Sequence, residues 1–518
     1  MTTKNILKMG VHLLAALALV AAAQPALEHV VSPGNGSHEG NSVTQDADGF
    51  IYLTGQHQAA ALVDGVTIAT LLGVDIETFG RTDFYLTKFT QNLEPVWVRT
   101  AGSKQFDFGT VVRVAPNGDA IVSGIYQGVM NFEGQELPYS GRGDTFVARF
   151  DSAGNLLWVQ TINGDEDVLA DGMTLDSDGN IYLSGRLSHL AMFGSEEIGV
   201  RFQKRAFLTK LDPNGAFIYA KVVANTSSSG AVVVDYGHDG NLYVGGTFAS
   251  QISGVFVASY STSGTQNFLH TYEGGTVDEI SDIRLGVDNH LYVCGRFSSA
   301  TLDLNGVVLE NPSDFFAGFV AKIKKSGEAV WAHVTGDRGI QLALGRSDTV
   351  FVTGYYTERT PMVADQTLEH GGGLDVFLTE IAADGSVQWV KNYSSTANDL
   401  ARTMAIANDG SLLLAGEGSH DAFGVEPLGG TVFLAKTGQV GTVPEVPSET
   451  PALTLQWVDG ALRLTLGEEF GGYTLEATSD LGAAFEAANQ FLESVPDLPN
   501  SFKISLDSPA RFFRVVEP

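Results

Sequence analysis

The chain has 518 residues, with 60 acidic side chains against 30 basic ones, and its formal net charge is -30. A surface this acidic repels phosphate backbones and anionic lipid, so the composition excludes nucleic acid and peripheral membranes as expected partners. The single cysteine excludes a disulfide scaffold and a cysteine-rich zinc or iron–sulfur site.

Residues 1–23 have the pattern of a secretory signal peptide. Lys4 and Lys8 precede an apolar run over residues 11–20, and three alanines follow at positions 21–23. This order of charged, apolar and small residues predicts cleavage after Ala23. The apolar run is too short to cross a bilayer comfortably, and no later run reaches about 18 apolar residues. The sequence therefore predicts a protein that is secreted or held at the cell surface, extracellular or periplasmic, without a transmembrane segment after cleavage.

A repeat of about 60 residues is the strongest signal in the remaining sequence. One unit reads TLDSDGNIYLSG over residues 174–185: a strand, a turn built on Asp and Gly, and a second strand that ends in glycine. The pattern occurs seven times, and its closing glycines are Gly55, Gly124, Gly185, Gly246, Gly295, Gly354 and Gly416. Such evenly spaced strands are typical of a repetitive β architecture.

A second segment of the form FVAK follows in every unit. It begins at Tyr85, Phe146, Phe207, Phe256, Phe319, Phe377 and Phe433. In the first six units a turn and an aromatic strand come next, with the aromatic residue at Trp97, Trp158, Tyr219, Phe268, Trp331 and Trp389. Each unit therefore predicts four short strands, and no interval has the period of a helix. A four-stranded sheet cannot bury both of its faces alone, so the fold class that we predict is all-β, a seven-bladed β-propeller.

The seventh unit lacks a fourth strand, because the chain turns to glycine and proline after residues 433–437. A spare strand, ALEHVV at residues 26–31, precedes the first unit. We predict that this N-terminal strand completes the last blade beside residues 433–437, so that both ends of the repeat region close one sheet. The predicted propeller domain spans residues 24–441.

The linked motifs DxDGNIYLSG and FVAKLDxxGxxxW resemble the repeats of bacterial seven-bladed β-propellers of the SBBP type. The resemblance covers about residues 26–437. It implies a secreted or surface protein, because most members of that family are exported. It also implies a scaffold more than an activity, because the family has no established shared catalytic site.

The residues beyond the propeller predict a second domain. Residues 442–451 (TVPEVPSETP) have the composition of a linker. Residues 452–518 alternate apolar and polar side chains, which predicts a small β-sandwich-like domain, and residues 485–492 admit a helical turn. The segments YTLEATSDL and RFFRV resemble the small C-terminal module that ends many secreted bacterial proteins. That resemblance implies either attachment or sorting, or an accessory domain that stabilises the chain.

The long connections of the repeat are where a binding surface is expected. In a four-stranded blade the first-to-second and third-to-fourth turns lie on one face, and here they are short and rich in glycine. The remaining connections are long and variable, and they share the opposite face, which we call the long-loop face. Function concentrates in loops on a rigid frame. Three of these connections contain strand-like pieces, residues 130–137, 191–198 and 302–309, which predict structural hairpins.

Most units carry an aspartate just before the first strand, about 17 residues ahead of the closing glycine. These residues are Asp107, Asp167, Asp278, Asp337 and Asp399, and two units have His38 and Ser229 there instead. Radial symmetry would gather the aspartates at the channel mouth, where a Ca²⁺ ion or a cationic ligand would offset their mutual repulsion. In the alternative that we favour, each aspartate accepts hydrogen bonds from backbone N–H groups of its own loop.

Other polar residues have structural interpretations. The D-x-D-G turns, such as residues 176–179, also suit calcium, but a tight hairpin demands the same residues, and we interpret them as turns. Cys294 stands in a strand, which indicates a buried and inert thiol. The recurring tryptophans indicate packing between blades. The pair His38 and Glu39 is expected to be solvated rather than catalytic.

No motif assigns a catalytic residue, since the sequence has no HExxH, no GxSxG, no P-loop and no GxGxxG after a strand. The leading hypothesis is a secreted, monomeric, non-catalytic scaffold whose long-loop face binds protein or polysaccharide, with no cofactor apart from the calcium considered above. One alternative is an exported propeller enzyme, a hydrolase or lyase that acts on carbohydrate. Another is a quinone-cofactor propeller, which the absence of an adjacent cysteine pair disfavours.

Overall fold

The computed structural model describes most of the repeat region. The described residues are 26–31, 34–35, 38–58, 61–63, 66–71, 74–223, 229–249, 253–275, 277–313, 315–418, 422 and 432–440, with seven short strands beyond residue 453. The chain divides into two compact units, residues 1–444 and 445–518. The predicted signal peptide over residues 1–23 and the predicted linker over residues 442–451 lie outside the described residues.

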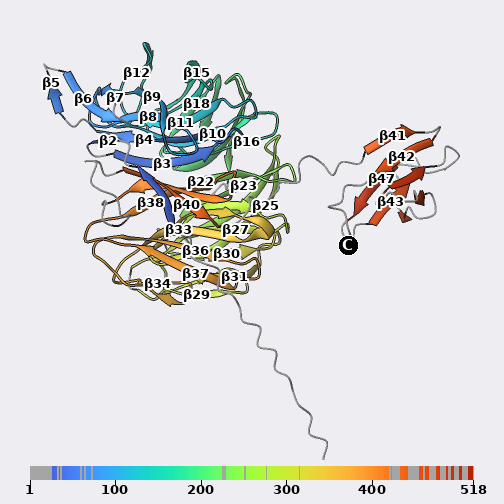
Figure 1. Cartoon of the computed structure of the whole chain (residues 1–518). Helices are drawn as coiled ribbons and strands as arrows, with labels where there is room; N and C mark the ends of the chain where they lie inside the picture. The colour runs from blue at the N-terminus through green and yellow to red at the C-terminus, as the bar shows by residue number, and fades with distance from the viewer. Residues whose placement is uncertain are drawn as a thin grey trace, which may run out of the picture. The chain divides into compact units, whose positions relative to one another are not determined.

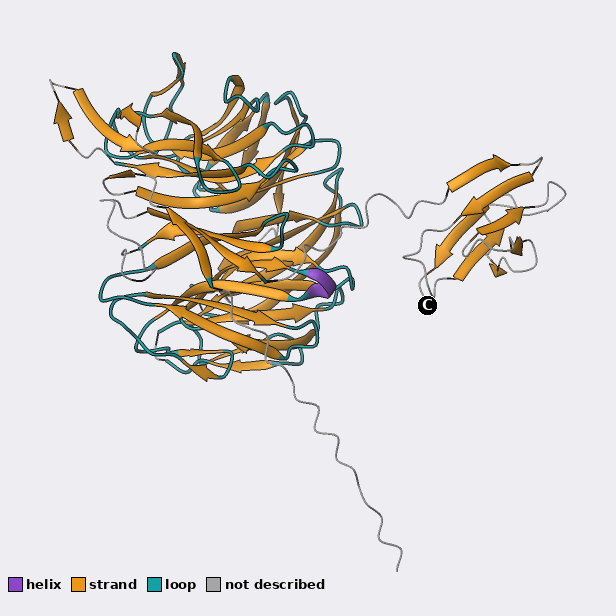
Figure 2. Ribbon diagram, viewed as in Figure 1, coloured by secondary structure: helices purple, strands orange, loops and turns teal. Residues whose placement is uncertain are grey.

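Within the described residues, seven antiparallel sheets of the first unit form the blades, and each blade is built on four strands. Figure 2 draws the strands in orange. Blade 1 is β3 (His38–Gln45), β4 (Ile51–His57), β8 (Asp83–Phe89) and β9 (Pro95–Ala101). Blade 2 is β10 (Asp107–Val114), β11 (Ala120–Tyr126), β14 (Asp144–Phe150) and β15 (Leu156–Gly164). Blade 3 is β16 (Val168–Leu175), β17 (Ile181–Leu187), β20 (Arg205–Leu211) and β21 (Phe217–Val223).

Blade 4 is β22 (Ser229–Tyr236), β23 (Asn241–Ala249), β24 (Ser253–Ser261) and β25 (Gln266–Gly274). Blade 5 is β26 (Glu279–Leu285), β27 (Leu291–Phe297), β30 (Ala317–Ile323) and β31 (Ala329–Val334). Blade 6 is β32 (Arg338–Leu344), β33 (Val350–Tyr356), β36 (Asp375–Ile381) and β37 (Val387–Tyr393). Blade 7 is β38 (Leu400–Ile406), β39 (Ser411–Glu417), β40 (Val432–Gln439) and β1 (Leu27–Val31).

The first strands of neighbouring blades contact one another around the whole ring, and β38 of blade 7 meets β3 of blade 1 (Figure 1). The predicted all-β, seven-bladed propeller is therefore confirmed for this unit. It forms because each four-stranded sheet buries its apolar faces against two neighbours, which a ring supplies to every blade.

The N-terminal strand closes the ring. β1 pairs antiparallel with β40, so that Val30 lies opposite Ala435 and Val31 lies opposite Leu434. Figure 1 shows this dark-blue strand beside the orange strands of blade 7. Leu27 and Val30 pack against the apolar cluster of blades 6 and 7. The predicted completion of the last blade is confirmed.

Short hairpins occupy several second-to-third connections. β12 (Met130–Phe132) pairs with β13 (Gln135–Leu137), β18 (Leu190–Phe193) with β19 (Glu196–Gly199), β28 (Thr301–Asp303) with β29 (Val308–Glu310), and β34 (Met362–Val363) with β35 (Gln366–Thr367). In blade 1, β5 (Ala61–Val63), β6 (Val66–Leu71) and β7 (Val74–Glu77) form a small sheet with β2 (Gly34–Asn35). The hairpins predicted at residues 130–137, 191–198 and 302–309 are confirmed.

The Asp-Gly turns are structural, as predicted. The Asp176 carboxylate accepts the backbone N–H groups of Asp178 at 3.1 Å and of Asn180 at 2.8 Å. Gly179 has a φ of +79°, which L-residues seldom adopt. Blade 6 lacks the turn glycine, and the 3-10 turn η1 (Arg346–Asp348), purple in Figure 2, takes its place.

Tryptophans of the fourth strands bind the third-to-fourth turn of the next blade. The Trp331 indole N–H donates to the Ala383 carbonyl oxygen at 3.0 Å, and Lys322 Nζ donates to the same oxygen at 2.9 Å. Trp97 and Trp158 donate likewise to the carbonyl oxygens of Ser152 and Pro213. The predicted role of these tryptophans in packing between blades is confirmed at these positions.

Gly385 lies in the turn that Trp331 covers. Its φ is +92°, and a Cβ there would lie 2.8 Å from Trp331 Cγ, whereas Gly118 has a φ of +85° with nothing within 4 Å of its Cβ position. We therefore expect Gly385→Ala to lower the free energy of unfolding by about 2–4 kcal/mol and Gly118→Ala by about 1 kcal/mol. Denaturant unfolding of both variants measures the difference, and equal losses would argue against the tryptophan contact.

The second unit contains two small sheets. Its strands are β41 (Thr454–Val458), β42 (Ala461–Thr465), β43 (Thr474–Thr478), β44 (Glu486–Ala487), β45 (Leu492–Ser494), β46 (Ser501–Ile504) and β47 (Phe512–Val516). Their orders are β41–β42–β46–β45 and β44–β43–β47. Strands β44 and β45 stand where the sequence admitted a helical turn, because they pair with β43 and β46. Within the described part of the chain, no helix has the length and apolarity needed to span a bilayer.

Candidate functional site

The channel at the centre of the ring is lined by charged side chains. They are Arg113, Asp171, Asp235, Asp282, Arg284, Arg338 and Arg402. Their neighbours in ion pairs are Glu39, Arg186, Glu279 and Glu417, and Glu279 also pairs with Arg296. These six arginines and six carboxylates balance, whereas the whole chain has twice as many acidic as basic residues. The channel is therefore locally neutral inside an acidic protein.

Several channel ion pairs join neighbouring blades. Arg402 of blade 7 lies 3.2 Å from Glu39 of blade 1. Arg284 of blade 5 lies 2.7 Å from Asp282 of its own strand and 3.7 Å from Asp235 of blade 4. Ion pairs in partly buried sites fix orientation more than they add net stability. These pairs therefore hold the channel charges in defined positions.

A second set of bonds connects the first strands, with a side-chain oxygen of one blade accepting a backbone N–H of the next. The acceptors are Ser42, Thr174, Asp235, Asp282, Gln341 and Thr403, and their donors are Val112, Tyr236, Leu285, Leu342, Met404 and Val43. Among the described residues this bond spans six of the seven boundaries between blades. Between blades 2 and 3 the Thr110 hydroxyl instead donates to the Ala170 carbonyl oxygen at 3.2 Å.

Arg113 of β10 differs from the other channel arginines. Among the described residues its guanidinium makes one hydrogen bond, from Nη1 to the Val112 carbonyl oxygen at 2.9 Å, and no ion pair. Burial and the charge of Arg284 lower the pKa of Arg113 to about 10, against the opposing effect of Asp282 and Asp235. A partly buried cation without a paired carboxylate is a candidate binding group for an anion.

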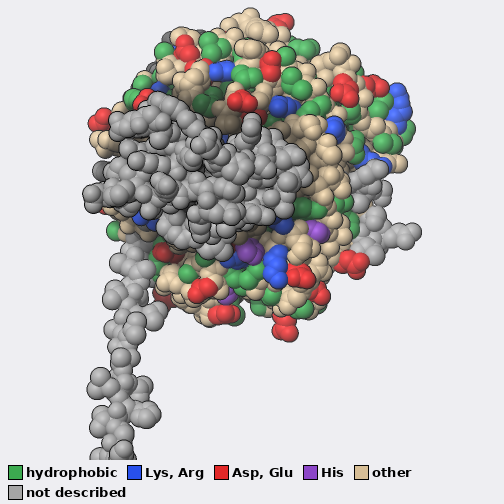
Figure 3. Space-filling model, turned by 90° about the vertical axis from the view of Figure 1, so that its right-hand side faces the viewer, with side chains coloured by type: hydrophobic (Ala, Val, Ile, Leu, Met, Phe, Trp, Pro, Cys, Tyr) green, Lys and Arg blue, Asp and Glu red, His purple; other side chains and the backbone are tan. Residues whose placement is uncertain are grey.

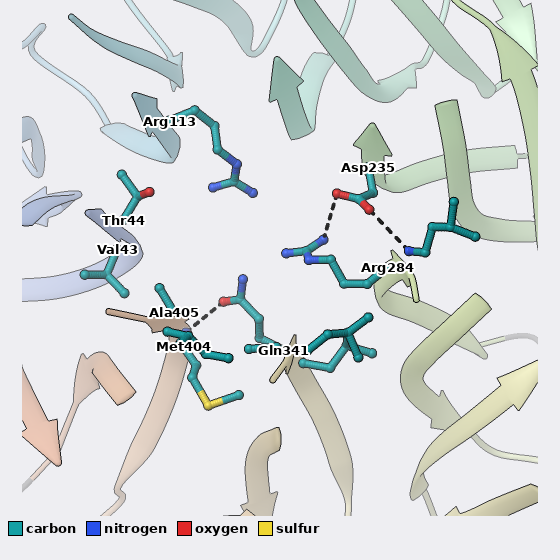
Figure 4. A pocket seen from close by; sticks show the side chains of 13 residues that line it. Val43, Thr44, Arg113, Asp235, Arg284, Gln341, Met404 and Ala405 are labelled. Carbon is teal, nitrogen blue, oxygen red and sulfur yellow. Dashed lines mark hydrogen bonds and ion pairs between the residues drawn. The ribbon is translucent and has the colours of Figure 1, made fainter. Parts of the chain in front are cut away.

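Two hollows of the channel share this lining. Their volumes are about 330 Å³ and about 150 Å³, and Arg113, Arg284 and Gln341 border both. Figure 4 shows the larger hollow with these three side chains around it. Sequence reasoning missed this site, because the residues come from three different blades. The signal that could have found it is their repeat position, since Arg113 and Arg284 both lie 11 residues before a closing glycine.

The aspartates predicted for the channel mouth lie at or just before the first strands. Asp107 accepts hydrogen bonds from the Ser103 hydroxyl at 3.0 Å and from the Gln127 N–H at 3.1 Å. Asp278 and Asp399 likewise accept from residues of their own inter-blade loops. Each of these three carboxylates thus orders the loop that enters its blade.

The other two predicted aspartates have different surroundings. Asp337 borders a hollow on the long-loop face, and Asp167 is half-buried. Within the described residues no group of three or more His, Cys, Asp or Glu side chains is arranged to hold a metal ion.

Calcium binding by the five aspartates stays a prediction. If it holds, millimolar Ca²⁺ raises the melting temperature by mass action, a chelator reverses the rise, and Asp278→Asn reduces it. A melting temperature that does not respond to Ca²⁺ would exclude the site.

Sequence reasoning also missed buried carboxylates at the start of third strands. Asp83, Asp144 and Asp375 each stand two residues before the aromatic residue of the FVAK segment, and this spacing is the signal that could have revealed them. Burial, with the charge of Asp107, raises the pKa of Asp83 to about 7, while the Phe79 N–H opposes the shift. Burial also raises the pKa of Asp107 to about 6.

These raised pKa values predict a pH dependence of stability. Both carboxyls bind protons more tightly in the folded chain than in the unfolded chain, where the pKa is about 3.9. Their stabilising contribution is therefore complete below about pH 4 and is lost as the pH rises through about 6–7. Asp83→Asn keeps an oxygen for the Phe79 N–H, which donates at 2.9 Å, and should reduce the fall in melting temperature between pH 5 and pH 8.

The matched control for this pH experiment is Asp178→Asn, at an exposed position of a tight turn. We expect this variant to keep the pH dependence of the wild-type chain. The assignment to Asp83 is wrong if Asp83→Asn keeps it as well.

His38 and His57 lie opposite each other on β3 and β4, with ring centroids 6.2 Å apart. Both side chains are fully buried, so the expectation that His38 is solvated is wrong, and the half-buried Glu39 pairs with Arg402. Burial and the charge of His38 lower the pKa of His57 to about 3, which keeps this imidazole neutral. Cys294 is buried as predicted, and burial raises the pKa of its thiol.

The exposed aromatic side chains of the described residues lie in connections of the long-loop face. Figure 3 shows the opposite face of the ring, which carries the tight turns and the 3-10 turn of Figure 2, and there acidic, basic and apolar groups are interspersed. Among the described residues three aromatic side chains are exposed, Phe106 by 38%, Phe202 by 89% and Phe315 by 57%. All three belong to connections of the long-loop face. This face therefore presents the large flat apolar groups that partners recognise.

Each exposed ring has a cationic or imidazole neighbour. The Arg81 guanidinium lies 5.2 Å from the centre of the Phe106 ring, and the Arg359 guanidinium lies 4.9 Å from that of Phe315. The His189 ring lies 4.9 Å from the Phe202 ring. A hollow of about 510 Å³ adjoins Phe315. Its polar lining is Asp337, Thr357, Glu358, Arg359 and His370.

No family model matches the chain. It is 22% identical over 409 residues to the regulatory protein FlaEY of Caulobacter vibrioides, which covers 70% of this chain and 40% of that protein. It is 23% identical over 263 residues to an uncharacterised WD repeat-containing protein of Acanthamoeba polyphaga mimivirus, which covers 41% of this chain and 19% of that protein. The chain thus spans less than half the length of either relative.

Among solved structures, the chain is similar to a polysaccharide lyase, an ulvan lyase of family PL25. The TM-score is 0.40 at 11% identity, over 81% of this chain and 97% of that one. These likenesses do not assign the chain to the family of any of these proteins.

Proposed function

We propose that the protein is an exported, non-catalytic binding scaffold that takes a protein or polysaccharide partner on its long-loop face. One observation carries the proposal: all three exposed aromatic side chains of the described residues lie on that face. Burying such rings against a partner removes apolar area from water and provides stacking contacts. The C-terminal unit is proposed to be an accessory β module of the same exported chain.

The hollow beside Phe315 suits such recognition. The ring offers an apolar plane, and Asp337, Glu358 and Arg359 offer acceptors and donors at its edge. Sugar rings and peptide side chains are both bound by this combination of a flat apolar contact and charged hydrogen-bonding groups. The hollow, at about 510 Å³, has the size of a small-ligand site.

The engagement of the carboxylates supports a role without catalysis. Channel carboxylates are held in ion pairs with arginines, and those before the first strands accept hydrogen bonds from their own loops. A general acid or base must instead be free to reach a substrate proton. The alternative function is the carbohydrate hydrolase or lyase considered from the sequence. A binding experiment must therefore also check whether a bound polysaccharide is cleaved.

The experiment uses the full chain against a panel of neutral and acidic polysaccharides and a peptide library. The test variant replaces Phe106, Phe202 and Phe315 by Ser. The control variant replaces Val96, Leu157 and Ile218 by Ser, since these apolar side chains are 48%, 50% and 56% exposed but lie on fourth strands. We expect the test variant to lose binding about tenfold or more and the control to keep it.

Two outcomes would contradict the proposal. Binding that survives loss of the three phenylalanines would move the partner to another surface. Release of shortened or unsaturated sugars from a bound polysaccharide would establish catalysis instead of binding.

A further inference from the structure

Three hydrogen-bond donors converge on the larger channel hollow. Arg113 reaches it from blade 2, Arg284 from blade 5 and Gln341 from blade 6, and Figure 4 shows the three side chains directed toward the same open space. Arg113 and Arg284 lie near the ends of their first strands, on the side of the tight turns, whereas Gln341 lies in the middle of β32. Leu344 and Ile406, which also line the hollow, are the last residues of their first strands. The hollow is therefore separate from the long-loop face, and an inference about it does not depend on the proposed function.

The orientation of the Gln341 amide is fixed by the backbone. Its Oε1 accepts the Met404 N–H of blade 7 at 2.9 Å. Because a carboxamide has one oxygen and one NH₂ group, this bond leaves the NH₂ group to the lumen. Figure 4 shows the nitrogen on the open side. Gln341 thus presents donors, and no acceptor, to a ligand.

Arg113 is the cation that a ligand can pair with. Arg284 already has Asp282 at 2.7 Å and Asp235 at 3.7 Å, whereas Arg113 has no paired carboxylate among the described residues. Its one bond, to the Val112 carbonyl oxygen, uses Nη1 and leaves other N–H groups for the lumen. A carboxylate matches the fork geometry of a guanidinium and accepts charge-assisted hydrogen bonds from it.

The rest of the lining restricts the ligand further. Asp235 and Asp282 beside Arg284 would repel a second negative charge, so a monovalent anion is favoured over sulfate or phosphate. Ala343, Leu344 and Ile406 form half-buried apolar walls of the same hollow, which suit an apolar ligand body. A volume of about 330 Å³ admits a small molecule.

We propose that the channel binds a small organic monocarboxylate. Its carboxylate accepts hydrogen bonds from Arg113 and from the Gln341 NH₂ group, and its apolar body packs against Ala343, Leu344 and Ile406. Binding places a negative charge beside the Arg113 guanidinium. Without a ligand, only carboxylates on the other side of the channel offset its charge in the described part of the chain.

The test titrates benzoate into the full chain by calorimetry, with benzyl alcohol as the uncharged analogue and sulfate as the divalent anion. We expect benzoate to bind about tenfold or more tightly than either. Gln341→Glu keeps an oxygen for the Met404 N–H but places a carboxylate oxygen against the ligand, and should weaken benzoate binding about tenfold or more. Arg142→Gln, at a side chain that is 77% exposed, should leave it unchanged.

Arg113→Gln provides a second test that does not rely on an inter-blade bond, because the Arg113 side chain makes none. It should weaken benzoate binding to a similar extent while the melting temperature stays near that of the wild-type chain. The proposal is overturned if the wild-type chain does not bind benzoate, if benzyl alcohol or sulfate binds as tightly, or if both channel variants bind benzoate like Arg142→Gln.

Discussion

A chain that lacks residues 1–31 should unfold at a markedly lower temperature than one that lacks only residues 1–25. The six additional residues include β1, whose residues pair with β40 at four positions. At about 1 kcal/mol for each ladder hydrogen bond, the loss is about 4 kcal/mol before the apolar contacts of Leu27 and Val30 are added. Removing β1 also leaves β40 as an open edge, which favours association between chains.

The chain that begins at Ala26 serves as the control, because it keeps β1 intact. Differential scanning calorimetry and light scattering measure the two effects together. The closure makes no important contribution if the two chains melt at the same temperature and stay equally monomeric.

Trp331→Ala should cost about 3–5 kcal/mol of the free energy of unfolding. The side chain is 8% exposed, and it belongs to the apolar cluster between blades 5 and 6. Its removal leaves a cavity above the turn that contains Gly385, and it takes one of two donors from the Ala383 carbonyl oxygen. Urea unfolding followed by fluorescence of the remaining tryptophans measures the loss.

Two further variants show which property of Trp331 stabilises the ring. One tests the indole N–H, and the other is a control at the preceding residue. Trp331→Phe keeps an aromatic ring without the indole N–H and should cost much less than Trp331→Ala. Val330→Ala changes the preceding residue, which is 44% exposed, and should cost little. If Trp331→Ala costs no more than Val330→Ala, the contact between blades does not stabilise the ring.

The repeat unit was predictable because its determinants are local. The Asp176 turn needs an acceptor at one residue and a positive φ at Gly179, three residues later, so the motif fixes the hairpin by itself. The FVAK segment and the tryptophan after it mark strands by composition alone. The closure by β1 was also predictable from the strand count. The seventh unit has only three strands, and one unassigned strand precedes the first unit, so pairing the two completes seven four-stranded blades.

The channel lining was not predictable by the same means. Each first strand contains an irregularity in its pairing, between Gly109 and Val111 in blade 2, and such a bulge shifts the alternation of side chains by one residue. Strict alternation therefore does not tell whether Arg113 faces the lumen or a neighbouring blade. The burial of His38 was also not predictable from its neighbours in sequence, which are rich in glycine. Its side chain is buried by residues that tertiary packing brings against it.

By itself the sequence determined the number of blades, their strands, the Asp-Gly turns and the strand that closes the ring, because each depends on residues close together in the chain. Only the tertiary structure decided which charges meet. Arg113, Arg284 and Gln341 are far apart in sequence. They line one hollow because closing seven sheets into a ring places the first strand of every blade beside the central channel. The site therefore depends on how the blades are arranged around the channel, which the sequence of a single repeat does not show.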